Sequence, residues 1–355
     1  MWARLEYRID AKHKFNKANG SEFTESYKRF YFTPASDNIT DEAIISEGLS
    51  KYYGEVKAVD DISFTVSRRE IFGFLGLNGA GKSTTIKMLS TLVSPTRGRA
   101  KVLGYDVTKD GLEIRKRIGV VQQQESYDRN LTVDASLRLY AALWGIEDHE
   151  ASEKINYLIE KFGLKDSVNR KIRWLSYGLR RRLQVAREFL HDADLLILDE
   201  PTVGMDVLAR HTFLDFCKDQ AGRGKTIFYT THIVSEAEYI CDKIAVIHHG
   251  RIIALDSPNE LKKRYTDVKG VSLIMKNDLD APRLFRALDA MSKEVLKKEV
   301  ISGTNEVRII SRDPFQLVFD LSKMLQSENF EVESISVTGP SLEEVIVRLV
   351  GDAGT

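Results

Sequence analysis

Two different periods govern the hydrophobic and polar positions along the middle of the chain. Residues 62–66 alternate with a period of two, which predicts a half-buried strand, and the apolar run 71–75 predicts a buried strand that leads through glycines into a helix. Similar signals continue to about residue 265, with strands predicted at 118–121, 195–198, 226–230 and 244–248 and helices at 84–92, 135–143, 151–162, 179–190 and 209–220. This order predicts an α/β sheet with helices on its faces.

Two further segments depart from this mixed pattern. Residues 127–174 carry helical signals throughout, which predicts an inserted helical subdomain. Residues 1–42 mix aromatic and polar side chains without a sustained period, and we interpret them as an N-terminal extension for which the pattern predicts no structure.

The last segment, residues 266–355, predicts a small α+β domain. Its strands are predicted at 271–275, 295–300, 307–310 and 330–337 and its helices at 282–291 and 314–327. This β-α-β-β-α-β order is typical of a ferredoxin-like module. Ser341 followed by Glu344 forms a capping box, which predicts a final helix ending near Gly351 within the same domain.

Composition and charge exclude several classes of protein. A chain of 355 residues is too long for one compact core, and its 52 basic and 52 acidic residues create no global field for a polyanion, which disfavours nucleic acid. Cys217 and Cys241 lack the spacing of a zinc site or a disulfide framework, which favours a reducing compartment. The longest stretch without charge, 71–81, is far shorter than the roughly 18 apolar residues of a membrane span. The charged N-terminus lacks the apolar run of a signal peptide, so we expect no export.

A phosphate-binding motif follows the buried strand. Residues 76–83 read Gly-Leu-Asn-Gly-Ala-Gly-Lys-Ser and match G-x-x-x-x-G-K-[ST] between a strand and a helix. The glycines let backbone N–H groups converge on phosphate oxygens, Lys82 reaches the β and γ phosphates, and the Ser83 hydroxyl can ligate Mg²⁺. The alternative, a glycine turn that binds nothing, is disfavoured because both the string and its context agree.

Two adjacent carboxylates, Asp199 and Glu200, end another buried strand. An uncompensated buried charge is strongly penalised, so a cation such as Mg²⁺ is expected beside them. Asp199 fits a residue that holds the metal through water, and Glu200 fits the general base that polarises the attacking water. Taken alone, the pair fits a strand end in solvent equally well. The phosphate-binding motif favours the catalytic interpretation.

Over about residues 44–262 the sequence resembles the nucleotide-binding subunit of ABC (ATP-binding cassette) transporters. The resemblance implies a P-loop NTPase fold with a RecA-like core and a helical subdomain, an ABC ATPase domain over residues 43–265, and ATP and Mg²⁺ as ligands. It implies ATP contacts from Tyr53, Asn78, Gly79, Ala80, Gly81, Lys82, Ser83, Thr84, Gln123, Ser176, Gly178 and Asp206, metal contacts from Ser83, Gln123 and Asp199, and catalysis by Lys82, Glu200 and His232.

Individual motifs carry these assignments. Tyr53 matches the aromatic side chain on which adenine stacks, although an ordinary tyrosine at a strand end is the alternative. Gln123 matches the glutamine that touches Mg²⁺ or water and senses the membrane partner, with Gln122 and Gln124 leaving the register open by one. His232 follows a strand about thirty residues beyond Glu200 and matches the histidine that contacts the γ-phosphate.

The signature of the family resembles residues 175–179, Leu-Ser-Tyr-Gly-Leu, which depart from LSGGQ at the third and fifth positions. Ser176 and Gly178 supply a hydroxyl and an N–H at the head of a helix, where they can grip a γ-phosphate, and Ser176 is also expected to be the helix N-cap. Asp206 matches the loop that couples the two sites of a dimer. The arginines at 180–182 are interpreted as a solvated helical face rather than a nucleic-acid patch.

The signature variant resembles the ABC-2 exporters, and residues 340–345 resemble the tail of daunorubicin-resistance-type exporter ATPases. The resemblance implies an ATP-hydrolysing subunit that drives a separate membrane permease from the cytoplasmic face, as a homodimer or heterodimer with ATP at the interface and Ser176 acting on the partner's site. We expect the C-terminal domain to serve dimer or partner contacts, so truncation near Tyr265 is expected to leave ATP binding intact.

Two rival functions are weighed against this one. The first is a soluble ABC ATPase acting on the ribosome or on nucleic acid. Such proteins usually carry two cassettes or a long coiled coil, and neither is found in the sequence. The second is a regulator that binds nucleotide without turnover, which the presence of Lys82, Asp199, Glu200 and His232 disfavours. The transported cargo is not encoded in any of these motifs.

Overall fold

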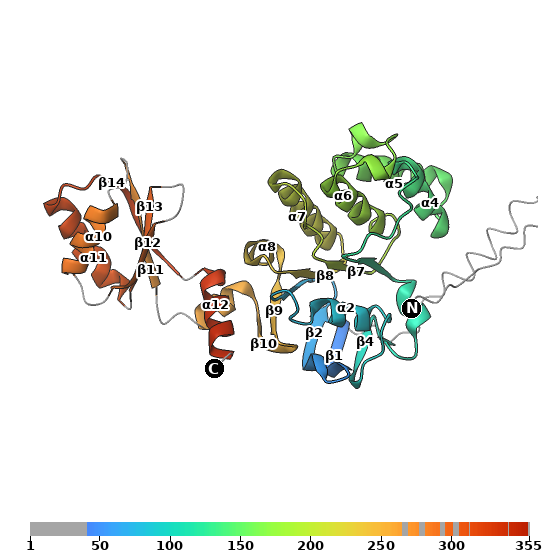
Figure 1. The fold of residues 1–355 in the computed structure, drawn as a ribbon, viewed down its shortest axis with the longest axis horizontal. Coiled ribbons are helices and arrows are strands. Elements are labelled where there is room, and N and C mark those ends of the chain that lie inside the picture. Colours follow the sequence, from blue (N-terminus) through green and yellow to red (C-terminus); the bar gives the residue numbers. More distant parts are fainter. Residues whose placement is uncertain are drawn as a thin grey trace, which may run out of the picture. The chain divides into compact units, whose positions relative to one another are not determined.

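The computed structural model describes residues 41–264, 269–276, 281–291, 295–300, 305–311, 313–339 and 341–353. Nearly all of the predicted N-terminal extension, residues 1–42, lies outside the described residues, as does Tyr265 at the predicted end of the central domain. The described residues form three sheets with helices packed on them (Figure 1).

A largely parallel sheet forms the centre of the region that ends at Arg264. Its strands are β3 (Ile71–Leu75), β6 (Ile118–Val121), β7 (Leu195–Asp199), β8 (Thr226–Thr231), β9 (Lys243–His248) and the antiparallel edge strand β10 (Arg251–Asp256), in the order β10-β9-β3-β8-β7-β6. Every residue of β3, β7 and β8 is buried, as expected for parallel strands that are covered on both faces. The predicted strands of this sheet are therefore present.

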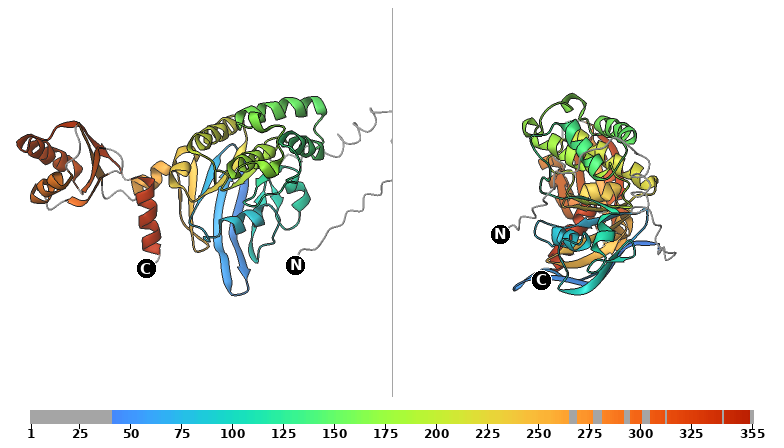
Figure 2. Two further views of the ribbon diagram at one scale, coloured as in Figure 1. Left: turned by 45° about the horizontal axis from the view of Figure 1, so that its top comes forward. Right: turned by 90° about the vertical axis from the view of Figure 1, so that its right-hand side faces the viewer.

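An antiparallel sheet packs against one face of the parallel sheet. It comprises β1 (Glu42–Tyr53), β2 (Val56–Ser67), β4 (Arg97–Val102) and β5 (Tyr105–Asp106) in the order β2-β1-β4-β5. The long hairpin of β1 and β2 can be followed in blue in Figure 2. Phe64 of β2 lies with its ring centroid 5.5 Å from that of Phe72 and 6.0 Å from that of Phe228, so aromatic side chains bind the two sheets together.

The helices of this region are α2 (Lys82–Leu89), α3 (Gly111–Arg115), α4 (Val133–Leu143), α5 (Asp148–Lys161), α6 (Tyr177–Glu188), α7 (Val207–Gly222), α8 (Val234–Ile240) and α9 (Pro258–Arg264), with 3₁₀ turns at Lys165–Ser167 and Ile172–Trp174. Helices α4 to α8 cover the opposite face of the parallel sheet, above it in Figure 1, whereas α2 and α3 pack on the side of the antiparallel sheet. The helical signals of residues 127–174 thus become α4, α5 and the two turns. Across the described part of the chain, no helix is both long enough and apolar enough to span a membrane.

A third sheet follows α9 along the chain. Its strands are β11 (Lys269–Met275), β12 (Val295–Val300), β13 (Glu306–Ser311) and β14 (Val332–Thr338), all paired antiparallel in the order β12-β13-β11-β14, with α10 (Ala281–Met291) and α11 (Pro314–Ser327) between them in sequence. Leu273 and Ile309 from the sheet pack with Leu288 and Leu321 from the helices in one core. The element order is the predicted β-α-β-β-α-β.

The last helix, α12 (Leu342–Ala353), corrects the predicted grouping of residues 266–355. It packs against α8, α9 and β10 of the central region, and Leu342 joins the core that lies beneath those helices. The reason is the spacing of its apolar side chains: Leu342, Val345 and Leu349 are buried on one helical face, which needs an apolar surface to cover it. The final helix therefore belongs to the fold of the central region, and the four-stranded module lies between α9 and α12 in the sequence.

Candidate active site

Four loops meet at one edge of the parallel sheet. Residues 76–83 follow β3, His232 follows β8, Glu200 follows β7 and Gln123 follows β6, and these strands are neighbours in the order β3-β8-β7-β6. The carboxyl ends of parallel strands lie at the same edge, which is where α/β proteins bind ligands. A cleft of about 450 Å³ opens there.

Most of the residues predicted to hold nucleotide line this cleft. They are Asn78, Gly79, Gly81, Lys82, Ser83, Thr84 and Gln123, and the predicted base Glu200 lies beside them. The cleft also contains Ala58, Tyr177, Arg181 and Val203, for which the sequence predicts no such place. Ala80 is buried in the loop itself, and its carbonyl accepts a hydrogen bond from the Gly250 N–H.

The loop between β3 and α2 needs glycine at specific positions. Gly81 is the N-cap of α2 with φ of 114°, a left-handed conformation that favours glycine, and a Cβ there would lie 2.6 Å from the Ala58 carbonyl oxygen. A Cβ on Gly76 would lie 2.4 Å from the Ile247 carbonyl oxygen. No side chain caps α2, so its first N–H groups face the cleft as donors for an anion.

Lys82 and Glu200 form a buried ion pair in the cleft. Lys82 Nζ lies 3.0 Å from Glu200 Oε1, and the two side chains are only 4% and 7% exposed. Lys82 also donates to the carbonyl oxygens of Gly76 at 2.7 Å and Leu77 at 3.2 Å. The ammonium is thus held between the phosphate-binding loop and the end of β7.

Glu200 is fixed from several sides. Its φ of 46° is left-handed, which is uncommon for a residue with a side chain, and its N–H lies 3.1 Å from both the carbonyl oxygen and the hydroxyl oxygen of Thr230. Its Oε2 lies 3.1 Å from His232 Nδ1, so the predicted base and the predicted γ-phosphate histidine are in direct contact. His232 is 38% exposed by side chain, which leaves its ring accessible to a ligand.

Asp199 offers oxygen ligands for a metal ion. It is 4% exposed, and its Oδ1 accepts a hydrogen bond from Thr230 Oγ1 at 2.7 Å. Burial raises the pKa of its carboxyl group above the ordinary value, although hydrogen bonds from Thr230 and Ser83 act in the opposite direction. A hydroxyl and a carboxylate beside a phosphate loop form the hard-oxygen donor set that suits Mg²⁺. Among the described residues no group of three or more His, Cys, Asp or Glu side chains could hold a metal ion by itself.

Ser176, Gly178 and Asp206 do not line the cleft of their own chain. Ser176 is the N-cap of α6, and its Oγ accepts a hydrogen bond from the Leu179 N–H at 3.3 Å, as predicted. Asp206 caps α7 by accepting from the Ala209 N–H at 2.9 Å, and this bond lowers the pKa of its carboxyl group. These residues stand at the heads of two helices on the side of the helical subdomain.

Tyr53 also lies away from the cleft lining. It ends β1, its side chain is 48% exposed, and Lys51 Nζ lies 5.3 Å from its ring centroid. Its exposed aromatic face is available for stacking.

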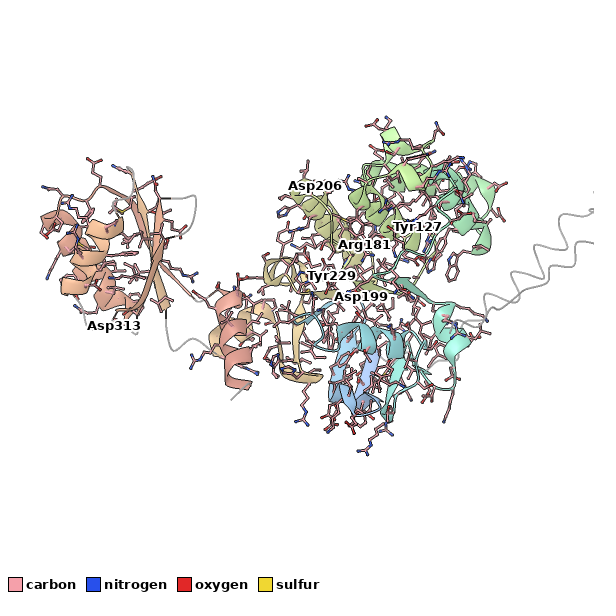
Figure 3. All side chains as sticks on the ribbon, in the orientation of Figure 1. Tyr127, Arg181, Asp199, Asp206, Tyr229 and Asp313 are labelled. Carbon is pink, nitrogen blue, oxygen red and sulfur yellow. The ribbon has the colours of Figure 1, made fainter. Side chains whose placement is uncertain are left out.

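The interpretation of residues 180–182 as a solvated face is wrong. Arg180 pairs with Glu125 at 2.7 Å and Arg182 pairs with Asp206, whereas Arg181 is 3% exposed and points toward the end of β7, near Asp199 (Figure 3). Helix geometry explains the difference, since three consecutive residues span about 200° of a helix and do not share one exposed face. Helical periodicity could therefore have shown from the sequence that the three arginines do not share one face. In the structure, burial lowers the pKa of the Arg181 guanidinium.

The chain is similar in sequence to ATP-binding proteins of exporters. The profile of the ABC transporter family matches residues 59–203. The Nod factor export ATP-binding protein I of Ralstonia nicotianae is 35% identical over 322 residues, 90% of this chain and 98% of that protein. The daunorubicin/doxorubicin resistance ATP-binding protein DrrA of Streptomyces peucetius is 37% identical over 311 residues, 87% of this chain and 92% of that protein. Both similarities extend well beyond the central region.

Solved structures resemble the chain over a shorter range. The ATP-binding subunit of an ABC transporter aligns with a TM-score of 0.59 and 30% identity, over 63% of this chain and 93% of that chain. A dimeric ATP-binding cassette in a post-hydrolysis state with ADP and Pi aligns with a TM-score of 0.56 and 21% identity, over 60% of this chain and 98% of that chain, which is a likeness of fold alone. Both agree with the predicted fold class.

Proposed function

This chain belongs to the family of ABC transporter ATP-binding subunits, which hydrolyse ATP, and we propose that it drives a separate membrane permease that exports its cargo. The names of its relatives support the direction, because they describe Nod factor export and daunorubicin/doxorubicin resistance. The observation that carries the proposal is the cleft at the strand ends, where Lys82, Glu200 and His232 are in contact beside the phosphate loop. The alternative function, a soluble ATPase that acts on the ribosome or on nucleic acid, is not supported by the names of these relatives.

The proposed roles of the cleft residues follow from what each side chain can donate or accept. The N–H groups of the loop and Lys82 hold the triphosphate. Ser83, Asp199 and Gln123 would hold Mg²⁺ directly or through water, and the ion would supply positive charge beside the phosphate oxygens. Glu200 accepts a proton from the attacking water, and His232, 3.1 Å from Glu200 Oε2, orients that carboxylate and contacts the γ-phosphate.

The proposed active unit is a head-to-tail dimer with two ATP molecules at its interface. Ser176 and Gly178 stand at the N-terminal end of α6 but do not line the cleft of their own chain, which supports a role in the site of a second subunit. Asp206 at the head of α7 would link the two sites, and Tyr53 would stack on adenine from its own chain. In this proposal ATP binds the closed dimer more tightly than the open one, so the dimer closes on ATP and opens after hydrolysis.

The proposed location is the cytoplasmic face of the membrane, where the chain binds its permease. Co-expression with the product of the neighbouring reading frame tests this proposal, which requires that product to be a membrane protein. We expect the chain to sediment with membranes only when that protein is present, and its ATPase rate to change in the complex. A chain that stays in the soluble fraction and hydrolyses ATP at the same rate with and without the membrane protein would contradict the transport proposal while leaving the ATPase activity in place.

A further inference from the structure

A single buried arginine connects α6 with two of the loops that form the cleft. Arg181 Nη2 donates to the carbonyl oxygens of Asp199 at 2.6 Å and Glu200 at 2.9 Å, and Nε donates to that of Pro201 at 3.2 Å. Nη1 donates to the Gln122 carbonyl oxygen at 2.6 Å. The guanidinium thus holds the main chain of three consecutive residues around the proposed base and that of the residue before Gln123.

The hydrogen-bonding capacity of this guanidinium is fully used. Its fifth contact is from Nη1 to Gln184 Oε1 at 2.8 Å, and Gln184 Nε2 in turn donates to the carbonyl oxygens of Gln122 at 2.9 Å and Gln124 at 2.7 Å. An arginine carries five N–H donors, and Arg181 directs all five at protein acceptors. Although it lines the cleft, it has no donor left for a phosphate oxygen. Arg181 therefore acts on the site by holding the backbone of the neighbouring residues in place.

We propose that Arg181 is a positioning residue that sets the Glu200 carboxylate for water activation and ties it to the helix that begins with Ser176. The inference rests on the proposed roles of Glu200 and Ser176. Glu200 has the left-handed backbone described above, with a φ of 46°, and such a conformation persists only when its surroundings hold it. Thr230 holds its N–H from one side, and Arg181 holds its carbonyl oxygen from the other.

The same contacts explain why the position requires arginine. The acceptors on the end of β7 lie along one edge of a planar fork, and the Gln122 carbonyl lies on the other side. Lysine has three donors at one point and cannot reach all of these oxygens at once. Because Arg181 is five residues from the N-cap Ser176 on one rigid helix, a displacement of the head of α6 moves the guanidinium and, with it, the backbone of Glu200.

The test compares R181K with the matched control R187K. Arg187 lies on the same helix and is also buried, at 7% exposed, but it donates to the carbonyl and hydroxyl oxygens of Ser126 and not to residues 199–201. We expect R181K to lower kcat for ATP hydrolysis by about 10- to 100-fold, the scale of a misplacement of roughly 1 Å, while its Kd for a fluorescent ATP analogue stays within about twofold of the parent. R187K is expected to keep the parental kcat, whatever the two substitutions do to Tm.

The outcomes separate this inference from the proposed function. A parent chain without ATPase activity would count against the proposed function, whereas an active parent with R181K at the same kcat overturns the positioning role alone. Equal losses of kcat in R181K and R187K, tracking Tm, would also overturn it. If R181K does not fold, R181Q decides, because its neutral amide buries no unpaired charge and supplies at most two of the five donors that hold residues 122, 184 and 199–201. A lower kcat with unchanged ATP affinity supports the proposal, and an unchanged kcat refutes it.

Discussion

Lys82 and Glu200 are paired in the protein itself, with Nζ 3.0 Å from Oε1 and both side chains almost completely buried. The lysine that is proposed to bind phosphate and the proposed general base therefore balance each other's charge. A γ-phosphate placed on the loop competes with Glu200 for the same ammonium group. We infer that nucleotide binding frees the carboxylate for water, so that activation of the base accompanies binding.

Glu200→Gln is expected to bind ATP at least as tightly as the parent and to stall as a closed dimer. The amide keeps the shape of the side chain but neither accepts a proton nor competes as an anion for Lys82, and loss of a general base typically costs about 10²- to 10⁴-fold in rate. Single-turnover hydrolysis and gel filtration with ATP and Mg²⁺ measure both effects. Hydrolysis by this variant at the parental rate would remove Glu200 from the role of base.

Lys82→Ala is expected to lose most of its ATP affinity. The substitution removes the cation that meets the phosphates, and it also leaves the Glu200 carboxylate buried without its partner, which costs about 3 to 5 kcal/mol of folding stability. Isothermal titration with ATP and thermal unfolding without nucleotide measure the two effects separately. A variant that binds ATP normally would show that the phosphates lie elsewhere.

Ser176 is expected to act on the site of the partner subunit. Ser176→Arg mixed with Lys82→Ala leaves one composite site made from the two unmutated halves, so nucleotide-driven dimerisation should partly return in the mixture although neither variant shows it alone. Light scattering with ATP measures the dimer mass. A mixture that fails as completely as the separate variants would argue that each site is built from one chain.

The packing of α12 predicts that the C-terminal helix stabilises the cassette. Leu342 is fully buried, and Leu342→Ala is expected to cost about 2 to 5 kcal/mol of unfolding free energy. Val347→Ala on the same helix is the control, because Val347 is 68% exposed. Urea unfolding measures both variants, and equal stability would contradict the docking of α12. Truncation near Tyr265 also removes this helix, so we now expect it to destabilise the cassette rather than leave ATP binding intact.

Stability is expected to fall between about pH 6.5 and pH 4 because of His191. Burial lowers the pKa of its imidazole from 6.5 to about 4, and the ring stacks on Trp144 at 3.9 Å between centroids with Nε2 3.2 Å from the Ile118 carbonyl oxygen. As the pH falls, the unfolded chain therefore binds a proton at this imidazole before the folded chain does. The folded state loses about 3 kcal/mol of stability between pH 6.5, above which the full contribution of His191 is present, and pH 4.

Thermal unfolding of the parent and of His191→Phe from pH 7.5 to pH 4.5 measures this dependence. The phenyl ring keeps the stacking partner of Trp144 and removes the titrating group, so the parent should lose more stability over that range than the variant does. His149→Gln is the control, because the His149 side chain is 89% exposed. Identical pH profiles for the parent and His191→Phe would show that His191 does not stay neutral in the folded chain.

Local sequence was sufficient to predict the chemistry of the loops. The string at 76–83 requires glycines where the backbone turns left-handed or approaches a carbonyl, and such requirements are readable residue by residue. The buried strand ending in Asp199 and Glu200 and the helix capped by Ser176 are equally local, because burial and capping leave short, characteristic patterns. The α/β fold class follows from the order of those patterns.

Tertiary structure alone decided which of these parts touch. The strands meet in the order β3-β8-β7-β6, which differs from their order in the chain, and only that order brings Lys82, Glu200 and His232 together. Arg181 looks like its charged neighbours in the sequence, and it is the packing of α6 against the end of β7 that makes it a buried donor. The destination of α12 depends on an apolar surface formed by residues about a hundred positions earlier. Contacts of this kind are set by the summed packing of distant segments, which no local pattern encodes.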